Sequence, residues 1–248
     1  NNNTQKIYLL NLIFKVINMQ SFITEIYKEN IWYSLQVFYY KELMIDCNNV
    51  IIEIEKGEWV VIQVTGLNIK YDKCLIEDGN ITVPDGAIVA ISGQSGAGKT
   101  SILYRLGLIS ISEDYTYILD GEKVDIGNKR TVAKLQQNNI GFLFQDGTMI
   151  ESLTVEENII FAAQTAGMTI QKNEIKELLE MVELSAEKMV EYPLKLSGGE
   201  RQRASLAMVL AKKTKYIIAD EPTASLDREN SQIIINLLCE LKKKGYSI

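Results

Sequence analysis

The feature that most constrains this chain is a glycine-rich loop between a predicted strand and a predicted helix. The apolar residues 87–92 read as a short strand, and residues 101–108 have the pattern of a helix. The loop between them, Gly93-Gln94-Ser95-Gly96-Ala97-Gly98-Lys99-Thr100, fits G-x-x-x-x-G-K-[ST] at every fixed position. Glycines let the backbone curl until several amide groups face one anion, and the following helix adds the positive end of its dipole. The segment therefore predicts a phosphate-binding loop in an α/β domain, with a glycine-rich turn that only caps a helix as the alternative.

The side chains of this loop suit a nucleoside triphosphate and its metal ion. Lys99 would neutralise the terminal phosphates, and the hydroxyl of Thr100 can ligate Mg²⁺. We expect ATP with Mg²⁺ as the ligand of the loop. The residues expected to contact the nucleotide here are Gly93, Gln94, Ser95, Gly96, Ala97, Gly98, Lys99, Thr100 and Ser101.

A pair of acidic residues follows a second apolar run. Residues 216–219 are short and fully apolar, as in a buried parallel strand, and Asp220, Glu221 and Pro222 come directly after them. Asp220 is placed at the end of that strand to ligate Mg²⁺. Successive strand residues point to opposite sides, so Glu221 is the candidate general base for an attacking water. The alternative interpretation is an acidic pair that only begins a helix.

Composition narrows the possible chemistry further. The chain has no histidine, which excludes Ser-His-Asp and Cys-His nucleophiles and every histidine-containing metal site. Its three cysteines form no C-x-x-C pair, so neither a zinc ribbon nor a disulfide scaffold is indicated. A formal net charge of -6 argues against a dedicated nucleic-acid binder. No stretch reaches the roughly 18 apolar residues of a membrane span.

The chain divides near residue 60. The first 56 residues contain neither glycine nor proline, and residues 7–28 and 33–44 carry apolar groups at helical offsets. We expect residues 1–59 to form a helical, aromatic-rich extension, either packed on the next domain or linking it to an upstream membrane portion. Strand patterns follow at residues 60–64 and 81–83.

Beyond residue 150 the pattern becomes helical. Thr154-x-x-Glu157 is a capping box, and residues 173–184 and 230–244 have helical periodicity. The expected architecture is an α/β domain over residues 60–248 with a helical subdomain at about residues 147–205.

Two glycines stand in a second capping box. Ser197-x-x-Glu200 explains a helix start but does not explain Gly198 and Gly199 between them. Glycines remove side chains from the helix N-terminus and open it to a second anion contact.

Taken in order, these motifs resemble the ATP-binding cassette (ABC) ATPases. The resemblance rests on the glycine loop, Gln145 after apolar residues 140–144, the Leu-Ser-Gly-Gly sequence, Asp220-Glu221 and then Asp227. It covers about residues 62–248. It implies a P-loop NTPase core with the ABC antiparallel β subdomain and an inserted helical subdomain.

The resemblance also implies a role for each matching residue. Lys99 and the loop amides would hold the β- and γ-phosphates, and Glu221 would polarise the hydrolytic water. Residues expected to serve Mg²⁺ and its waters are Thr100, Gln145 and Asp220. Residues expected to meet a partner subunit in a head-to-tail dimer are Ser197 and Gly199, at the γ-phosphate, and Asp227, at the seam. Tyr71 lies where the family stacks an aromatic ring on adenine, with simple packing as the alternative.

The same resemblance predicts partners and location. Ser197 follows Lys99 by 98 positions and there is one cassette, which favours a transport ATPase over the soluble relatives that act on ribosomes or DNA. The motifs look most like the ATPases of lipoprotein release, macrolide export and bacteriocin or antimicrobial-peptide export. We expect a second nucleotide-binding domain and a membrane permease as partners, no nucleic acid, and a peripheral position on the cytoplasmic face of the cell membrane. Cargo is expected to be a peptide, bacteriocin, antibiotic or lipid-linked molecule.

One family feature is absent. The family carries a switch histidine at the end of the strand after the Asp227 region, and this chain contains no histidine. We therefore expect a C-terminal truncation just before that position. Such a fragment should bind ATP better than it hydrolyses it.

Overall fold

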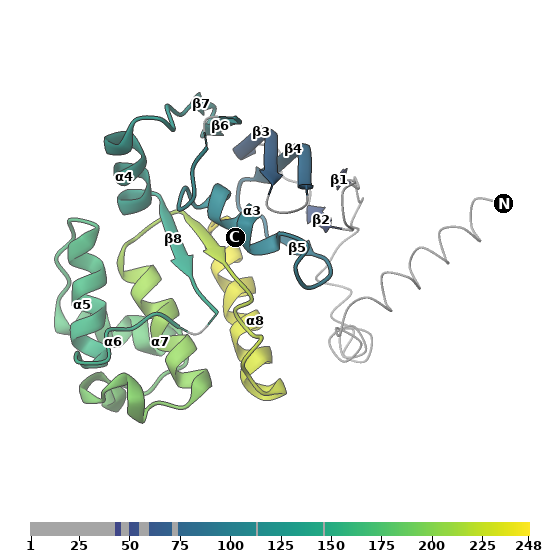
Figure 1. Cartoon of the computed structure of the whole chain (residues 1–248). Helices are drawn as coiled ribbons and strands as arrows, with labels where there is room; N and C mark the ends of the chain where they lie inside the picture. Colours follow the sequence, from purple (N-terminus) through teal and green to yellow (C-terminus); the bar gives the residue numbers. More distant parts are fainter. Residues whose placement is uncertain (1–42, 46–49, 55–59, 71–73, 113, 146) are drawn as a thin grey trace.

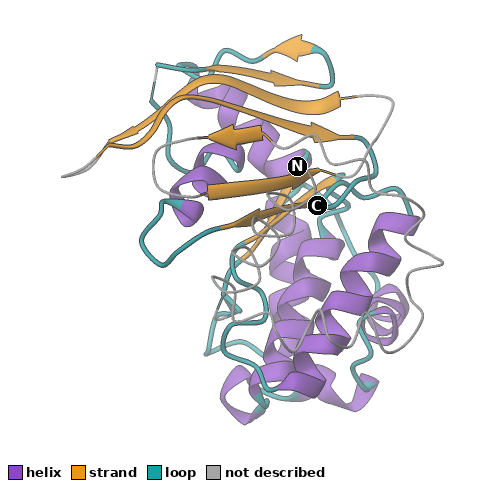
Figure 2. Ribbon diagram, turned by 90° about the vertical axis from the view of Figure 1, so that its right-hand side faces the viewer, coloured by secondary structure: helices purple, strands orange, loops and turns teal. Residues whose placement is uncertain are grey.

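The structure is a computed structural model that describes residues 43–45, 50–54, 60–70, 74–112, 114–145 and 147–248. Strands gather in one part of the molecule and most helices in the other (Figure 2). Among the described residues, no helix combines the length and the hydropathy that crossing a bilayer requires.

An antiparallel sheet of four strands forms the outer layer of the strand-rich part. Its order is β4-β3-β6-β7, and its strands are β3 (Val60–Lys70), β4 (Cys74–Pro84), β6 (Thr116–Leu119) and β7 (Glu122–Lys123). Every neighbouring pair is antiparallel. Both long strands extend the predicted strand patterns at 60–64 and 81–83, and the antiparallel β subdomain is confirmed.

A second group of strands leads to the glycine loop. Strands β8 (Ile140–Leu143) and β9 (Tyr216–Ala219) pair in parallel, and for β9 the short apolar sequence predicted a buried parallel strand. Residues 247–248 lie between β9 and β5 (Val89–Ser92): Ser247 bridges to Tyr216, and the amide of Val89 donates to the carbonyl of Ile248 at 2.8 Å. The carboxyl ends of these strands therefore reach one edge, where the acidic pair and the glycine loop both begin.

Two further strands lie in the segment predicted to be a helical extension. Strand β2 (Val50–Ile54) pairs with β5 and with β1 (Leu43–Ile45), in both cases antiparallel. The helical prediction is wrong at positions 43 and 44. The run Val-Ile-Ile-Glu-Ile in β2 is rich in β-branched residues, which favour strands, and β5 offers it an edge with which to pair. The other predicted helical residues, 7–28 and 33–42, lie outside the described residues.

Helices cover these strands and form the inserted subdomain (Figure 1). The helices beside the strands are α3 (Lys99–Leu106), α4 (Lys129–Asn138) and α8 (Arg228–Lys243). The inserted elements are α5 (Val155–Thr165), α6 (Lys172–Met181), the 3₁₀ helices η2 (Ala186–Val190) and η3 (Pro193–Lys195), and α7 (Gly198–Ala211). The inserted α-helical subdomain of the predicted fold is thus confirmed, although α7 continues past the predicted limit near residue 205.

Both predicted capping boxes are present. The hydroxyl of Thr154 accepts from the amide of Glu157, and the Glu157 carboxylate accepts from the Thr154 amide at 2.8 Å. Ser197 and Glu200 make the same reciprocal pair at the start of α7. These caps satisfy amides that a helix start would leave without partners.

Candidate active site

The glycine loop lies between β5 and α3, where the sequence predicted it. Gly96 and Gly98 have φ angles of 78° and 93°, in the left-handed region that side chains rarely adopt. A side chain at Gly98 would also approach Leu75 to 3.2 Å. Two positions of the motif therefore require glycine for backbone geometry.

The ammonium group of Lys99 folds back over this loop. Its Nζ donates to the carbonyl oxygens of Gly93 at 3.1 Å and Gln94 at 3.2 Å, and lies 3.8 Å from Oε1 of Glu221. The Lys99 side chain is only 19% exposed. A cation held at the loop in this way is placed to meet phosphate oxygens.

Next to Lys99, the side chains of Thr100 and Asp220 form a hydrogen bond, although 120 positions separate them in the sequence. The Thr100 hydroxyl donates to Oδ1 of Asp220 at 3.2 Å. Burial at the end of β9 raises the pKa of the Asp220 carboxyl, while the hydrogen bond from Thr100 opposes that shift. A hydroxyl and a carboxylate are the hard oxygen donors that Mg²⁺ prefers, so these residues fit the predicted ion. The described residues contain no group of three or more histidine, cysteine or acidic side chains that could hold a metal ion.

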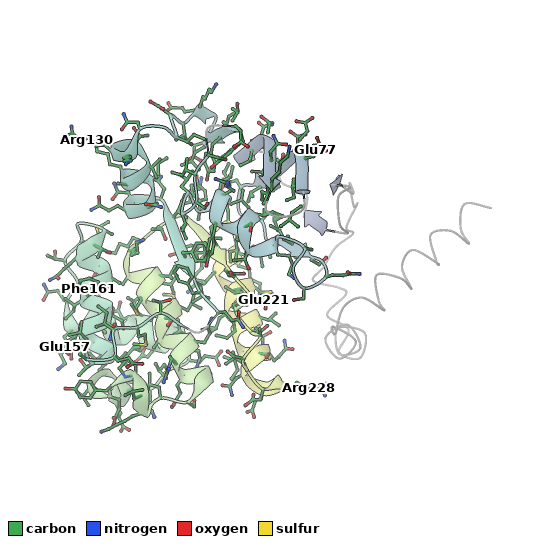
Figure 3. All side chains as sticks on the ribbon, viewed as in Figure 1. Glu77, Arg130, Glu157, Phe161, Glu221 and Arg228 are labelled. Carbon is green, nitrogen blue, oxygen red and sulfur yellow. The ribbon has the colours of Figure 1, made fainter. Side chains whose placement is uncertain are left out.

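The carboxylate of Glu221 points away from the Thr100–Asp220 pair, toward Lys99. Its φ of 44° lies in the left-handed region, a strained conformation for a residue with a side chain. The carboxylate approaches Lys99, whereas that of Asp220 contacts Thr100. The Glu221 side chain is 45% exposed and lies in the segment between β9 and α8 (Figure 3). The two carboxylates therefore have different partners.

Gln145 follows the strand next to the acidic pair. The β8–β9 register pairs Leu143 with Ala219, so Gln145 and Asp220 both follow the carboxyl ends of adjacent strands. The Gln145 side chain is exposed. This position is compatible with the predicted role beside the metal ion.

The residues on both sides of Gln145 contact α7, which the sequence did not indicate. Nε2 of Gln202 donates to the carbonyl of Phe144 at 3.1 Å. Gly147 is buried with a φ of 62°, and a Cβ there would lie 2.7 Å from Oγ of Ser205. Gly147 therefore packs against α7, the helix that begins after Ser197.

Asn158 fixes the next part of this segment. Its fully buried side chain accepts from the amide of Ile150 at 2.7 Å, and its Nδ2 lies within 3.0 Å of the carbonyl oxygens of Ile150, Leu153 and Thr154. One side chain therefore satisfies several backbone groups between Gln145 and α5.

Substituting Asn158 by alanine should lower the free energy of unfolding by about 1–3 kcal/mol, because backbone groups would lose their partners. Urea unfolding measures the change. Asn173→Ala, at an exposed position in the first turn of α6, is the control and should change stability little. Equal stabilities of the two variants would contradict the anchoring role.

The Leu-Ser-Gly-Gly motif begins α7, away from the loop. Helix α7 belongs to the inserted helical subdomain, whereas α3, which follows the glycine loop, lies beside the strands (Figure 1). Ser197 bonds within its own turn to Glu200, whose pKa is lowered by hydrogen bonds from Lys188 and from the Ser197 amide. Ser197 and Gly198 are exposed, and Gly199 is buried. The start of α7 thus faces solvent rather than its own glycine loop.

Two more predicted residues, Asp227 and Ser101, lie in the described part of the chain, and a third, Tyr71, does not. Asp227 caps α8 by accepting from the amide of Asn230 at 2.8 Å. Ser101, in the first turn of α3, is half-buried. Tyr71, the predicted adenine contact, lies outside the described residues and its role stays a prediction.

Comparison with known proteins identifies the family of this site. The profile of the ABC transporter family matches residues 76–224. The macrolide export ATP-binding/permease protein MacB of Campylobacter jejuni is 35% identical over 179 residues, or 71% of this chain and 28% of that protein. The lipoprotein-releasing system ATP-binding protein LolD of Aquifex aeolicus is 36% identical over 172 residues, or 68% of this chain and 76% of that protein. This chain therefore spans less than a third of the MacB relative and about three quarters of LolD.

A solved structure supports the same assignment. The ATP-binding cassette MJ0796, described as a dimer in a post-hydrolysis state bound to ADP and Pi, matches with a TM-score of 0.65 and 26% identity. The match covers 74% of this chain and 83% of that one. From its motifs, its fold and these relatives, this chain belongs to the ABC transporter family.

Proposed function

We propose that this chain binds ATP with Mg²⁺ and hydrolyses it to drive transport through a membrane permease. The observation that carries the proposal is the convergence of Lys99, Thr100, Asp220 and Glu221 at the carboxyl ends of β5 and β9. Lys99 and the loop amides would hold the β- and γ-phosphates, and Thr100 and Asp220 would hold Mg²⁺, with Gln145 contributing to its water shell. The ion would stabilise negative charge on the phosphate oxygens.

Glu221 is proposed to accept a proton from the attacking water. Its carboxylate is exposed enough to reach a water and is separate from the pair that fits the metal ion. Because the chain has no histidine, a carboxylate is the natural candidate for the general base.

The complete site is proposed to form between two cassettes arranged head to tail. The exposed Ser197 and the adjoining Gly199 would meet the γ-phosphate held by the glycine loop of the partner. The position of α7 away from its own loop supports this arrangement, as does the dimeric state of the MJ0796 cassette. Backbone amides at a helix start favour an anion.

A permease is the second proposed partner. The inserted subdomain exposes large apolar side chains, including Phe161 at 46%, Val190 at 66% and Leu194 at 68%. Phe161 projects outward from α5 (Figure 3). Exposed apolar side chains suit contact with another protein, here a permease at the cytoplasmic face of the membrane.

Export is the proposed direction of transport. The similar MacB and LolD proteins are named for macrolide export and lipoprotein release, and a similar SyfD protein for probable syringafactin export. We propose a peptide, bacteriocin, antibiotic or lipid-linked cargo. The net charge of -6 disfavours the alternative, a soluble ATPase that acts on ribosomes or DNA.

Gln145→Ala should spare ATP binding and uncouple hydrolysis from transport. Gln202 of α7 holds the carbonyl of Phe144, directly before Gln145, and Asn158 of α5 holds the segment after it, so a change at the nucleotide can move those helices. In the transporter reconstituted with its permease, cargo moved per ATP should fall about fivefold or more. Gln164→Ala, exposed on α5, is the control. Unchanged coupling in the Gln145 variant would contradict this role.

A further inference from the structure

A continuous set of side-chain contacts joins α7 to the start of α8. Nη1 of Arg203 donates to Oδ1 of Asn230 at 2.9 Å. Nδ2 of Asn230 lies 3.1 and 3.0 Å from the two carboxylate oxygens of Asp227, and the Asn230 amide donates to the same carboxylate. Asn230 therefore contacts the helix of the Leu-Ser-Gly-Gly motif and the aspartate at the predicted dimer seam.

The same asparagine explains why position 199 is glycine. A Cβ on Gly199 would lie 1.9 Å from Oδ1 and 2.3 Å from Cγ of Asn230. A Cβ on Gly198 would meet Leu226 at 3.6 Å, an ordinary contact. The two glycines of the motif thus differ, because only Gly199 has another side chain packed directly on its Cα.

The chemistry of an amide suits this position. Arg203 is only 8% exposed, and its Nε has no hydrogen-bond partner among the described residues. Asp227 is exposed, and hydrogen bonds from Asn230 lower the pKa of its carboxyl. An asparagine side chain offers an acceptor to the buried cation and a donor to the carboxylate, which neither alanine nor aspartate can do together.

We propose that Asn230 is a positioning residue that fixes Ser197 and Gly199 relative to Asp227. Through Arg203 and Gly199 it locates the first turn of α7, and through its amide nitrogen it holds Asp227 at the start of α8. The two segments then present one pre-arranged surface to the partner cassette. This inference rests on the proposed head-to-tail dimer and adds a residue that organises it.

The test is ATP-dependent self-association of the chain in a Glu221→Gln background, measured by sedimentation velocity. Asn230→Ala should raise the dimer dissociation constant about tenfold or more, because the start of α7 and Asp227 would then have to be ordered when the partner binds. The affinity of each chain for MgATP should stay unchanged, since Asn230 contacts α7 and Asp227 and not the glycine loop. Arg203→Met should weaken association similarly, and the double variant should be no worse than either single one.

Two controls separate positioning from general stability. Asn236→Ala changes an exposed asparagine on the same helix and should leave association unchanged. Ile234→Val removes a buried methyl group from α8, so it should lower the unfolding temperature without altering the Asn230 contacts. The proposal would be overturned if Asn230→Ala left association unaffected. It would also be overturned if Ile234→Val, at matched stability, weakened association equally. Failure of the Glu221→Gln chain itself to associate with ATP would instead overturn the composite site and, with it, the role of Asn230.

A second measurement examines the contact with Gly199. Gly199→Ala should lower the unfolding temperature because its methyl group meets Asn230. Adding Asn230→Ala removes that collision, so the double variant should be more stable than the sum of the two single effects predicts. Strict additivity would show that Gly199 and Asn230 do not constrain each other.

Discussion

Lys99→Ala is expected to lower the affinity for MgATP at least about tenfold. A hydrogen bond to a charged group contributes roughly 1.5–3 kcal/mol, and a change of about 1.4 kcal/mol corresponds to tenfold in affinity. Lys99 is the cation that folds over the glycine loop, close to Glu221 and to two loop carbonyls. Equilibrium binding of a fluorescent ATP analogue measures the loss.

Lys134→Ala provides the matched control for this variant. Lys134 is an exposed lysine on α4, and its removal changes the net charge by the same amount. ATP affinity should be unchanged in this variant. If both lysine variants bind ATP as the unsubstituted chain does, the phosphate-binding role of the loop is wrong.

Glu221→Gln is expected to stop hydrolysis while preserving ATP binding. General-base catalysis typically contributes about 10²–10⁴-fold to a rate, and glutamine keeps the shape of the side chain but cannot accept the proton. The structure separates this carboxylate from the Thr100–Asp220 pair, so the metal donors should remain intact. Phosphate release under saturating MgATP measures the rate, and the same binding assay measures the affinity.

The control for Glu221→Gln is Glu177→Gln, at an exposed position on α6. It should retain the hydrolysis rate of the unsubstituted chain. Normal turnover in the Glu221 variant would mean that another group activates the water. A loss of binding in the same variant would mean that Glu221 helps to hold the nucleotide.

Local signals in the sequence predicted the core of the site. The spacing of Gly98, Lys99 and Thr100 after an apolar strand depends on a short stretch of chain, and the structure keeps it. The apolar run before Asp220 predicted a buried parallel strand, and pairing with β8 then brings Asp220 to Thr100. Each step follows from a pattern within one segment and from the common direction of parallel strands.

Contacts between distant segments could not be predicted in this way. Gln202 reaches the Phe144 carbonyl across 58 positions, and Arg203 reaches Asn230 across 27. Both are polar residues in a helix, and no local pattern says which side of α7 is buried. The strand at Val50–Ile54 was missed for a related reason: a short apolar run suits either helix or strand until a neighbouring edge is available to pair with it.

Calorimetric titration of the unsubstituted chain with ATP tests the central claim most directly. If the loop and the Thr100–Asp220 pair form a nucleotide site, one ATP should bind per chain in a saturable reaction. Binding should weaken when Mg²⁺ is removed with a chelator, and ADP should compete. Absence of saturable binding in the presence of Mg²⁺, or ATP binding that the chelator and ADP leave unchanged, would contradict the account.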